Sequence, residues 1–137
     1  MTALAVKRRY QRRVAAAVAV YLVSLFGANY LIGERQVSGA LAWGIALLPG
    51  LAVAGLFYAI GMLIVEQKDE FQRMLLVRLN LIAAGFAMSM ASIWGFLESF
   101  ALVGHLNAYL IVVAWALGQA LGAASNRLTH GTWGACW

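Results

Sequence analysis

Charged residues are confined to short clusters in this chain, and long uncharged apolar runs separate the clusters. Hydrophobic residues make up 64% of the 137 residues, whereas soluble domains contain about 45–50%. A helix needs about 20 apolar residues to cross about 30 Å of hydrocarbon. The pattern therefore excludes a soluble fold and predicts an all-α, polytopic membrane protein.

The apolar runs predict four transmembrane helices in a compact bundle that forms a single membrane domain over residues 1–137. The first run is longer than the apolar region of a signal peptide and lacks its cleavage signature, so we expect an uncleaved anchor. Pro49 near the middle of the second run predicts a kink. The expected spans cover about residues 14–32, 41–64, 79–98 and 107–126.

The basic residues predict the orientation, because Lys and Arg in short loops are retained on the cytoplasmic side. Five bases precede the first span, three (Lys68, Arg73 and Arg78) lie in a charged hairpin over residues 66–78, and Arg127 follows the last span. The expected outer loops contain one basic residue, Arg35. We therefore expect both termini and the hairpin in the cytoplasm, which requires an even number of spans.

The net charge of +5 is concentrated in the N-terminal cluster. Because this cluster immediately precedes an apolar run, we expect it to contact anionic lipid head groups and no nucleic acid. Its members are Lys7, Arg8, Arg9, Arg12 and Arg13.

The hairpin 66–78 is the charge-dense segment in the interior of the chain, and its pattern suits a helix that continues out of the second span. Asp69 and Arg73 stand four residues apart, and Glu70 and Arg73 three apart, so both are favourable helical pairs. One interpretation makes Asp69, Glu70 and Arg73 a docking surface for a partner. The other makes the segment a solvated hairpin, since exposed ion pairs contribute little to stability.

Glu98 is the acid at the far end of the third span. It follows Arg78 by 20 residues, which corresponds to about 30 Å of helix and places it at the outer boundary of the membrane. Such an acid can reach water and have no further role. Alternatively, Glu98 is a contact for a ligand or a proton, with His105 as its partner across the short outer loop.

Small residues recur at four-residue spacing within the expected spans, as helix packing in membranes requires. Uncharged polar residues are few there, and transport of a charged solute usually leaves ionisable groups near the midplane. The pattern thus favours packing over transport. The spacings are Gly118-x-x-x-Gly122, Ala91-x-x-x-Gly95, Gly55-x-x-x-Ala59 and Ala40-x-x-x-Gly44.

The sequence contains no pattern typical of an enzyme, a cofactor site or a metal site. His105 and His130 lie at opposite ends of the expected bundle, so they are unsuited to bis-histidine haem ligation. His130 and Cys136 are too few for zinc. We expect a non-enzymatic protein without a cofactor.

The chain also contains several short motifs, which are Leu48-Pro49-Gly50, Glu66-x-x-Asp69-Glu70-Phe71-Gln72-Arg73, Trp94-Gly95-Phe96-Leu97-Glu98, Trp115 and Asn126-Arg127. Together these motifs resemble those of a family of small uncharacterised integral membrane proteins of proteobacteria. The resemblance covers about residues 14–128 and implies a four-helix protein of the bacterial inner membrane, without implying an activity. The N-terminal arm and the tail Gly131–Trp137 lie outside it.

Two functions follow from these patterns. The first is an accessory or assembly subunit that packs against a larger membrane complex or associates with itself, with the hairpin as its docking surface. The second is a small transporter or a binder of lipophilic ligands, active as a dimer around the Pro49 kink, with Glu98 as its polar contact.

Overall fold

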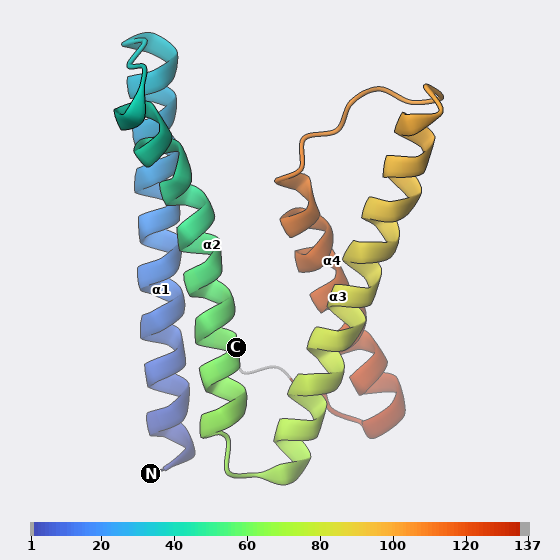
Figure 1. Ribbon diagram of the computed structural model, residues 1–137. Helices are drawn as coiled ribbons and strands as arrows, with labels where there is room; N and C mark the ends of the chain where they lie inside the picture. Colours follow the sequence, from blue (N-terminus) through green and yellow to red (C-terminus); the bar gives the residue numbers. More distant parts are fainter. Residues whose placement is uncertain (1, 135–137) are drawn as a thin grey trace. The chain divides into compact units, whose positions relative to one another are not determined.

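The structure, a computed structural model, describes residues 2–134, and its elements within that range are all helices (Figure 1). The predicted all-α fold class is confirmed. The elements are α1 (Ala3–Ala28), the π-helical turn η1 (Asn29–Glu34), α2 (Ala40–Glu66), α3 (Glu70–Ser99) and α4 (Leu110–His130).

Three helical segments within residues 2–134 are long and apolar enough to cross a membrane, which supports a membrane protein. They are Ala3–Glu34, Ala40–Glu66 and Glu70–Ser99. α4 is not among them, because Gln119 and the Asn126-Arg127 pair lower its hydropathy. The fourth span and the orientation stay predictions.

The first helix begins earlier than its apolar run. We expected the span to start at Val14, but α1 starts at Ala3 and includes the N-terminal basic cluster. Residues 3–13 contain neither Gly nor Pro, and Lys, Arg, Gln and Ala are good helix formers, so nothing in this stretch stops the helix. The basic side chains are therefore carried on helical turns.

We had expected the charged segment 66–78 to continue the helix of the second span, and this prediction is wrong. α2 ends at Glu66, the backbone of Gln67 is extended, and a new helix starts at Glu70. Asp69 begins that helix, because its carboxylate accepts hydrogen bonds from the backbone N–H groups of Phe71 and Gln72, at 2.9 and 3.4 Å. Only residues 67–69 are non-helical, and most of the segment belongs to α3.

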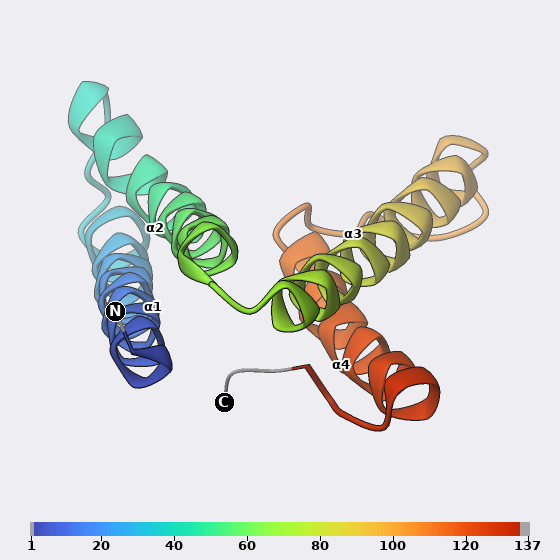
Figure 2. The ribbon, with the colours of Figure 1, turned by 90° about the horizontal axis from the view of Figure 1, so that it is seen from below.

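The chain divides into two compact units, Met1–Lys68 and Asp69–Trp137, each built around a pair of helices. In the first unit α1 and α2 lie side by side (Figures 1 and 2). Gly55 faces Ala17 across this pair, and Ala59, one turn later, is fully buried. The Gly55-x-x-x-Ala59 spacing thus lies on the face that packs against α1. A single bundle of all four helices stays a prediction.

In the second unit α3 and α4 cross in close contact and diverge toward their connecting loop (Figure 2). A Cβ atom added at Gly118 would lie 2.7 Å from the Cα of Ala83, and one at Gly122 would lie 2.7 Å from the carbonyl oxygen of Leu79. The predicted Gly118-x-x-x-Gly122 packing is confirmed here. At Gly95, by contrast, an added Cβ would have nothing within 4 Å among the described residues.

The C-terminal segment folds back onto this second unit. Gly131 ends α4 in the left-handed conformation, with φ of 72°, and Gly134 is buried beside Leu75 and Asn126. Asn126, which is fully buried, donates to the carbonyl oxygen of Leu75 at 3.1 Å. The last part of the predicted tail, including Cys136, lies outside the described residues.

Candidate functional site

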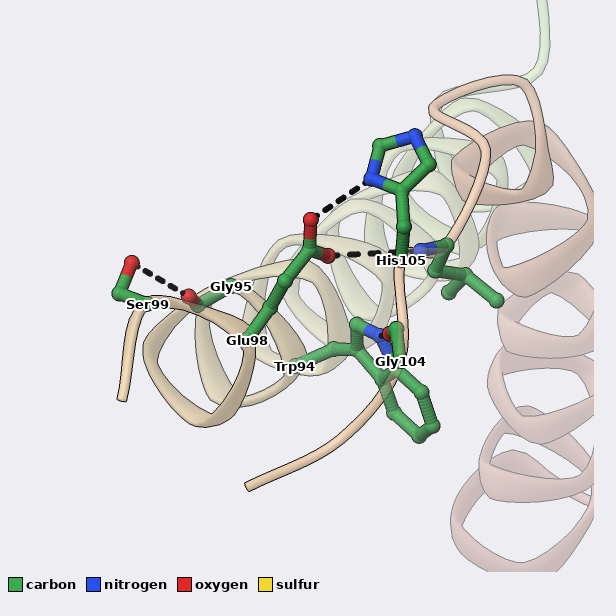
Figure 3. A network of polar contacts seen from close by, with 7 residues as sticks. Trp94, Gly95, Glu98, Ser99, Gly104 and His105 are labelled. Atoms are coloured by element: carbon green, nitrogen blue, oxygen red, sulfur yellow. Dashed lines mark hydrogen bonds and ion pairs between the residues drawn. The ribbon is translucent and has the colours of Figure 1, made fainter. Parts of the chain in front are cut away.

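The structure brings Glu98 and His105 together (Figure 3). Glu98 lies in the last turn of α3, and its Oε1 atom is 2.7 Å from Nδ1 of His105. The other carboxylate oxygen, Oε2, accepts a hydrogen bond from the backbone N–H of Leu106 at 3.4 Å. One carboxylate therefore holds two consecutive residues of the loop between α3 and α4 against the end of α3.

A second contact fastens the same loop. Nε1 of Trp94 donates to the carbonyl oxygen of Gly104 at 3.3 Å, one turn before Glu98 on α3 (Figure 3). Trp94 and Glu98 are thus two anchors on one helical face, and the loop residues 104–106 lie across them. This gives Glu98 a structural task that needs no ligand.

The Glu98–His105 pair is open to its surroundings. The side chain of His105 is 76% exposed and that of Glu98 is 34% exposed. Among residues 2–134, no group of three or more His, Cys, Asp and Glu side chains is placed to hold a metal ion. The arrangement suits proton exchange or a hydrogen-bonded ligand at the helix end, and its role as a ligand or proton contact stays a prediction.

The three predicted docking residues lie together at the start of α3 and do different things there. Asp69 caps the helix, as described above. Arg73 forms an ion pair with Glu70, with Nη1 and Oε1 at 3.0 Å. Phe71 and Met74 are exposed beside this pair. The surface therefore combines an ion pair, an aromatic ring and a flexible thioether on a rigid helix.

Arg13, the last residue of the N-terminal cluster, forms an ion pair within the chain. Arg8, Arg9 and Arg12 are exposed, as contact with lipid head groups requires. Arg13 instead points to the end of α2, where its Nη2 atom lies 2.9 Å from Oε1 of Glu66. The pair joins the two helices of the first unit, and sequence reasoning missed it because 53 residues separate its members.

An apolar groove follows the contact between α1 and α2. Its volume is about 460 Å³, and its lining includes Val20 and Ser24 of α1, Leu31 of η1, and Ile45 and Leu48 of α2. The lining contains no charged side chain. Such a wall suits acyl chains or the apolar face of another helix, and it does not suit a charged solute.

A polar layer lies between α3 and α4. Gln119 donates to Oδ1 of Asn80 at 2.9 Å, and Asn80 donates to the carbonyl oxygen of Leu76 at 2.8 Å. In the sequence, the signal for this layer is the spacing of the polar residues in α4. Gln119 and Asn126 stand seven residues apart and share a helical face.

A third group of polar contacts lies where the start of α3 meets the end of α4. Arg78 donates from Nη2 to Oγ of Ser125 at 3.2 Å, and its Nη1 atom is 3.5 Å from Nδ1 of His130. Oγ1 of Thr129 is 2.8 Å from the same imidazole nitrogen. We call Arg78, Ser125, Thr129 and His130 the Arg78 cluster. Arg78 had been counted in sequence only as a base that sets orientation.

Comparison with known proteins adds no relative. No family model, no curated protein and no solved structure matches this chain.

Proposed function

We propose that this chain is a non-enzymatic accessory or assembly subunit of a bacterial inner membrane. In this proposal it crosses the membrane four times, keeps both termini in the cytoplasm, and packs against a larger membrane complex or another copy of itself. The placement in the inner membrane rests on the resemblance to proteobacterial membrane proteins, and the orientation rests on the positive-inside count.

The observation that carries the docking role is the extension of α3 beyond its expected span. Residues 70–78 continue the helix for about 13 Å before the span starts near residue 79. Asp69 fixes the start of this extension, so Glu70 and Arg73 are held in a defined geometry and not on a mobile loop. Exposed aromatic residues, Met and Arg are enriched where proteins bind one another.

The polar layer of α4 supports the fourth span. α4 is 21 residues long, or about 31 Å, which is sufficient to cross the hydrocarbon. Its low hydropathy results partly from Gln119 and Asn126, which are hydrogen-bonded to α3. Polar groups that hydrogen-bond to a neighbouring helix cost less in a membrane than groups that face lipid.

The docking role is tested by affinity capture of the full-length chain, extracted in a mild detergent at native expression, with mass spectrometry of the proteins that accompany it. We expect a stoichiometric membrane partner or a homo-oligomer for the wild type. Arg73→Glu places two acids side by side on the extension and should remove the associated chain. Arg35→Glu is the control, because it makes the same charge change in the predicted outer loop, where binding should be retained.

A second variant separates recognition from folding. The double exchange Glu70→Arg with Arg73→Glu keeps the ion pair within the helix but reverses its direction. We expect this variant to fold like the wild type and to bind its partner less. Recovery of every variant, and of the wild type, as a monomer without a stoichiometric partner would contradict the accessory role.

A further inference from the structure

The Arg78 cluster contains a guanidinium without a carboxylate partner in the described part of the chain. Two other arginines in residues 2–134 have such partners, since Arg13 pairs with Glu66 and Arg73 with Glu70. Arg78 contacts the hydroxyl of Ser125 and the imidazole of His130. A partly buried cation is normally compensated by a nearby negative charge. The side chains that Arg78 contacts provide no such charge.

The same arginine lies at the edge of a groove along α3. The groove has a volume of about 610 Å³ and an otherwise apolar wall formed by Met74, Val77, Leu81 and Ile82, with Glu70 and Arg73 at its far edge. Glu70 and Arg73 neutralise one another through their ion pair. Arg78 is therefore the source of the net positive charge of this groove.

The depth of Arg78 follows from the length of α3. Arg78 and Glu98 are 20 residues apart on one continuous helix, so about 30 Å separates them, the thickness of the hydrocarbon core. With Glu98 at one boundary, Arg78 lies at the other, at the level of the lipid phosphates. Leu81 and Ile82 follow it toward the membrane interior, at the level of the acyl chains.

We propose that the Arg78 cluster binds the phosphate of an anionic phospholipid, with an acyl chain of that lipid in the adjoining groove of α3. A guanidinium presents two N–H groups in the geometry that phosphate oxygens accept. Ser125 and Thr129 add hydroxyls, and His130 adds an imidazole ring. In the expected orientation the cluster faces the cytoplasmic leaflet, where anionic lipids attract basic groups. The groove borders the proposed docking surface at Glu70, Arg73 and Met74, whereas the polar contacts of the Arg78 cluster lie outside that surface.

Native mass spectrometry of the purified full-length chain in detergent tests the proposal. The chain is mixed with phosphatidylglycerol, with phosphatidylcholine of the same acyl chains, or with inorganic phosphate. We expect one phosphatidylglycerol molecule to bind at least about tenfold more tightly than phosphatidylcholine, as the loss of a charge-assisted hydrogen bond would predict. Equal binding of the two lipids, or binding of inorganic phosphate with the same affinity as phosphatidylglycerol, would overturn the lipid site.

Variants assign the binding to the cluster. Arg78→Gln should reduce the affinity for phosphatidylglycerol about tenfold and leave that for phosphatidylcholine unchanged. Arg35→Gln removes the same charge from the first unit, where the side chain contacts Tyr30, and should leave both affinities unchanged. An equal loss in the two variants would mean that net charge alone attracts the lipid, which would overturn the site.

Arg78 also joins α3 to α4, so its replacement can disturb folding. His130→Gln provides an independent variant, because His130 is exposed at the end of α4 and its replacement leaves the Arg78–Ser125 contact in place. We expect a severalfold loss of phosphatidylglycerol affinity in this variant, with an unchanged circular dichroism spectrum. Arg78→Lys keeps the positive charge but removes the paired N–H groups of the guanidinium, so it should also bind phosphatidylglycerol less tightly. The proposed geometry would be contradicted if both folded variants, His130→Gln and Arg78→Lys, kept the affinity of the wild type.

Discussion

Ala101 occupies a backbone position that glycine would fill with less strain. Its φ of 57° lies in the left-handed region, immediately after Phe100, the C-cap of α3. The backbone N–H of Leu102 bonds to the carbonyl oxygen of Leu97, and that of Ala101 bonds to the carbonyl oxygen of Glu98. These two bonds form a Schellman motif, in which the left-handed residue is usually Gly. The end of α3 is therefore set by its hydrogen bonds, against the local preference of alanine.

Ala101→Gly should stabilise the protein by about 1 kcal/mol, because glycine removes the clash of Cβ with the backbone at positive φ. The measurement is the free energy of unfolding of the detergent-solubilised chain in a denaturant titration. Ala84→Gly, within α3, serves as the control and should destabilise by about 0.5–1 kcal/mol. A loss of stability in Ala101→Gly would show that α3 ends differently.

A contact between two residues could be predicted from the sequence only where few residues separate them along the chain. Glu98 and His105 are joined by a brief loop, so their proximity followed from the chain itself. Arg13 with Glu66, and Arg78 with Ser125, are 53 and 47 residues apart. Their contacts depend on the register of two helices, which neither hydropathy nor charge counting determines.

Among the elements, α4 shows how packing alters the meaning of composition. Its hydropathy falls short of that of the other long helices because polar residues recur along it, but Gln119 and Asn126 are bonded to α3. The glycines of the same helix bring the two backbones into contact. The α3–α4 pair is thus held by close backbone approach together with interhelical hydrogen bonds.

Gly118→Ala should lower the free energy of unfolding by about 1–3 kcal/mol, the usual effect of overpacking. The added methyl would meet the backbone of Ala83, which has no rotamer to change, so the helices must separate. Thermal unfolding in detergent measures the effect. Gly95→Ala adds the same methyl where nothing lies within 4 Å, so it should be neutral or stabilising. Equal effects of the two substitutions would contradict the proposed contact.

The elements themselves were largely predictable, and their ends were not. Four helices were expected and four long helices are described, since apolar runs of this length are a strong signal. The early start of α1 and the break at Gln67 depend on helix propensity and on the cap formed by Asp69. A hydropathy profile does not show these local effects, because it measures how favourably a segment partitions into lipid and not where the backbone can start or end a helix.

At the scale of the whole molecule, the number of crossings and the positions of the termini are linked by parity. Four crossings place both ends of the chain on one side, whereas three would place the C-terminus outside. Charge counting favours four, and hydropathy alone identifies three in residues 2–134. The polar contacts of α4 with α3 explain this difference and favour the even number.

Cysteine labelling in intact cells distinguishes the two topologies. With four crossings, the natural Cys136 should be protected from a membrane-impermeant maleimide until the cells are lysed. Leu102→Cys, made in a Cys136→Ser background, should react in intact cells because residue 102 lies in the predicted outer loop. Reaction of both cysteines in intact cells would mean that α4 does not cross.

The hydrogen bonds between α3 and α4 also bear on how the protein enters its membrane during synthesis. A segment whose amide side chains have no hydrogen-bond partner enters lipid at a high free-energy cost, and α3 provides partners for both Gln119 and Asn126 of α4. The insertion machinery would therefore have to retain α3 until the last helix leaves the ribosome. The two helices would then pass into the bilayer together as a hairpin, with the amides already bonded.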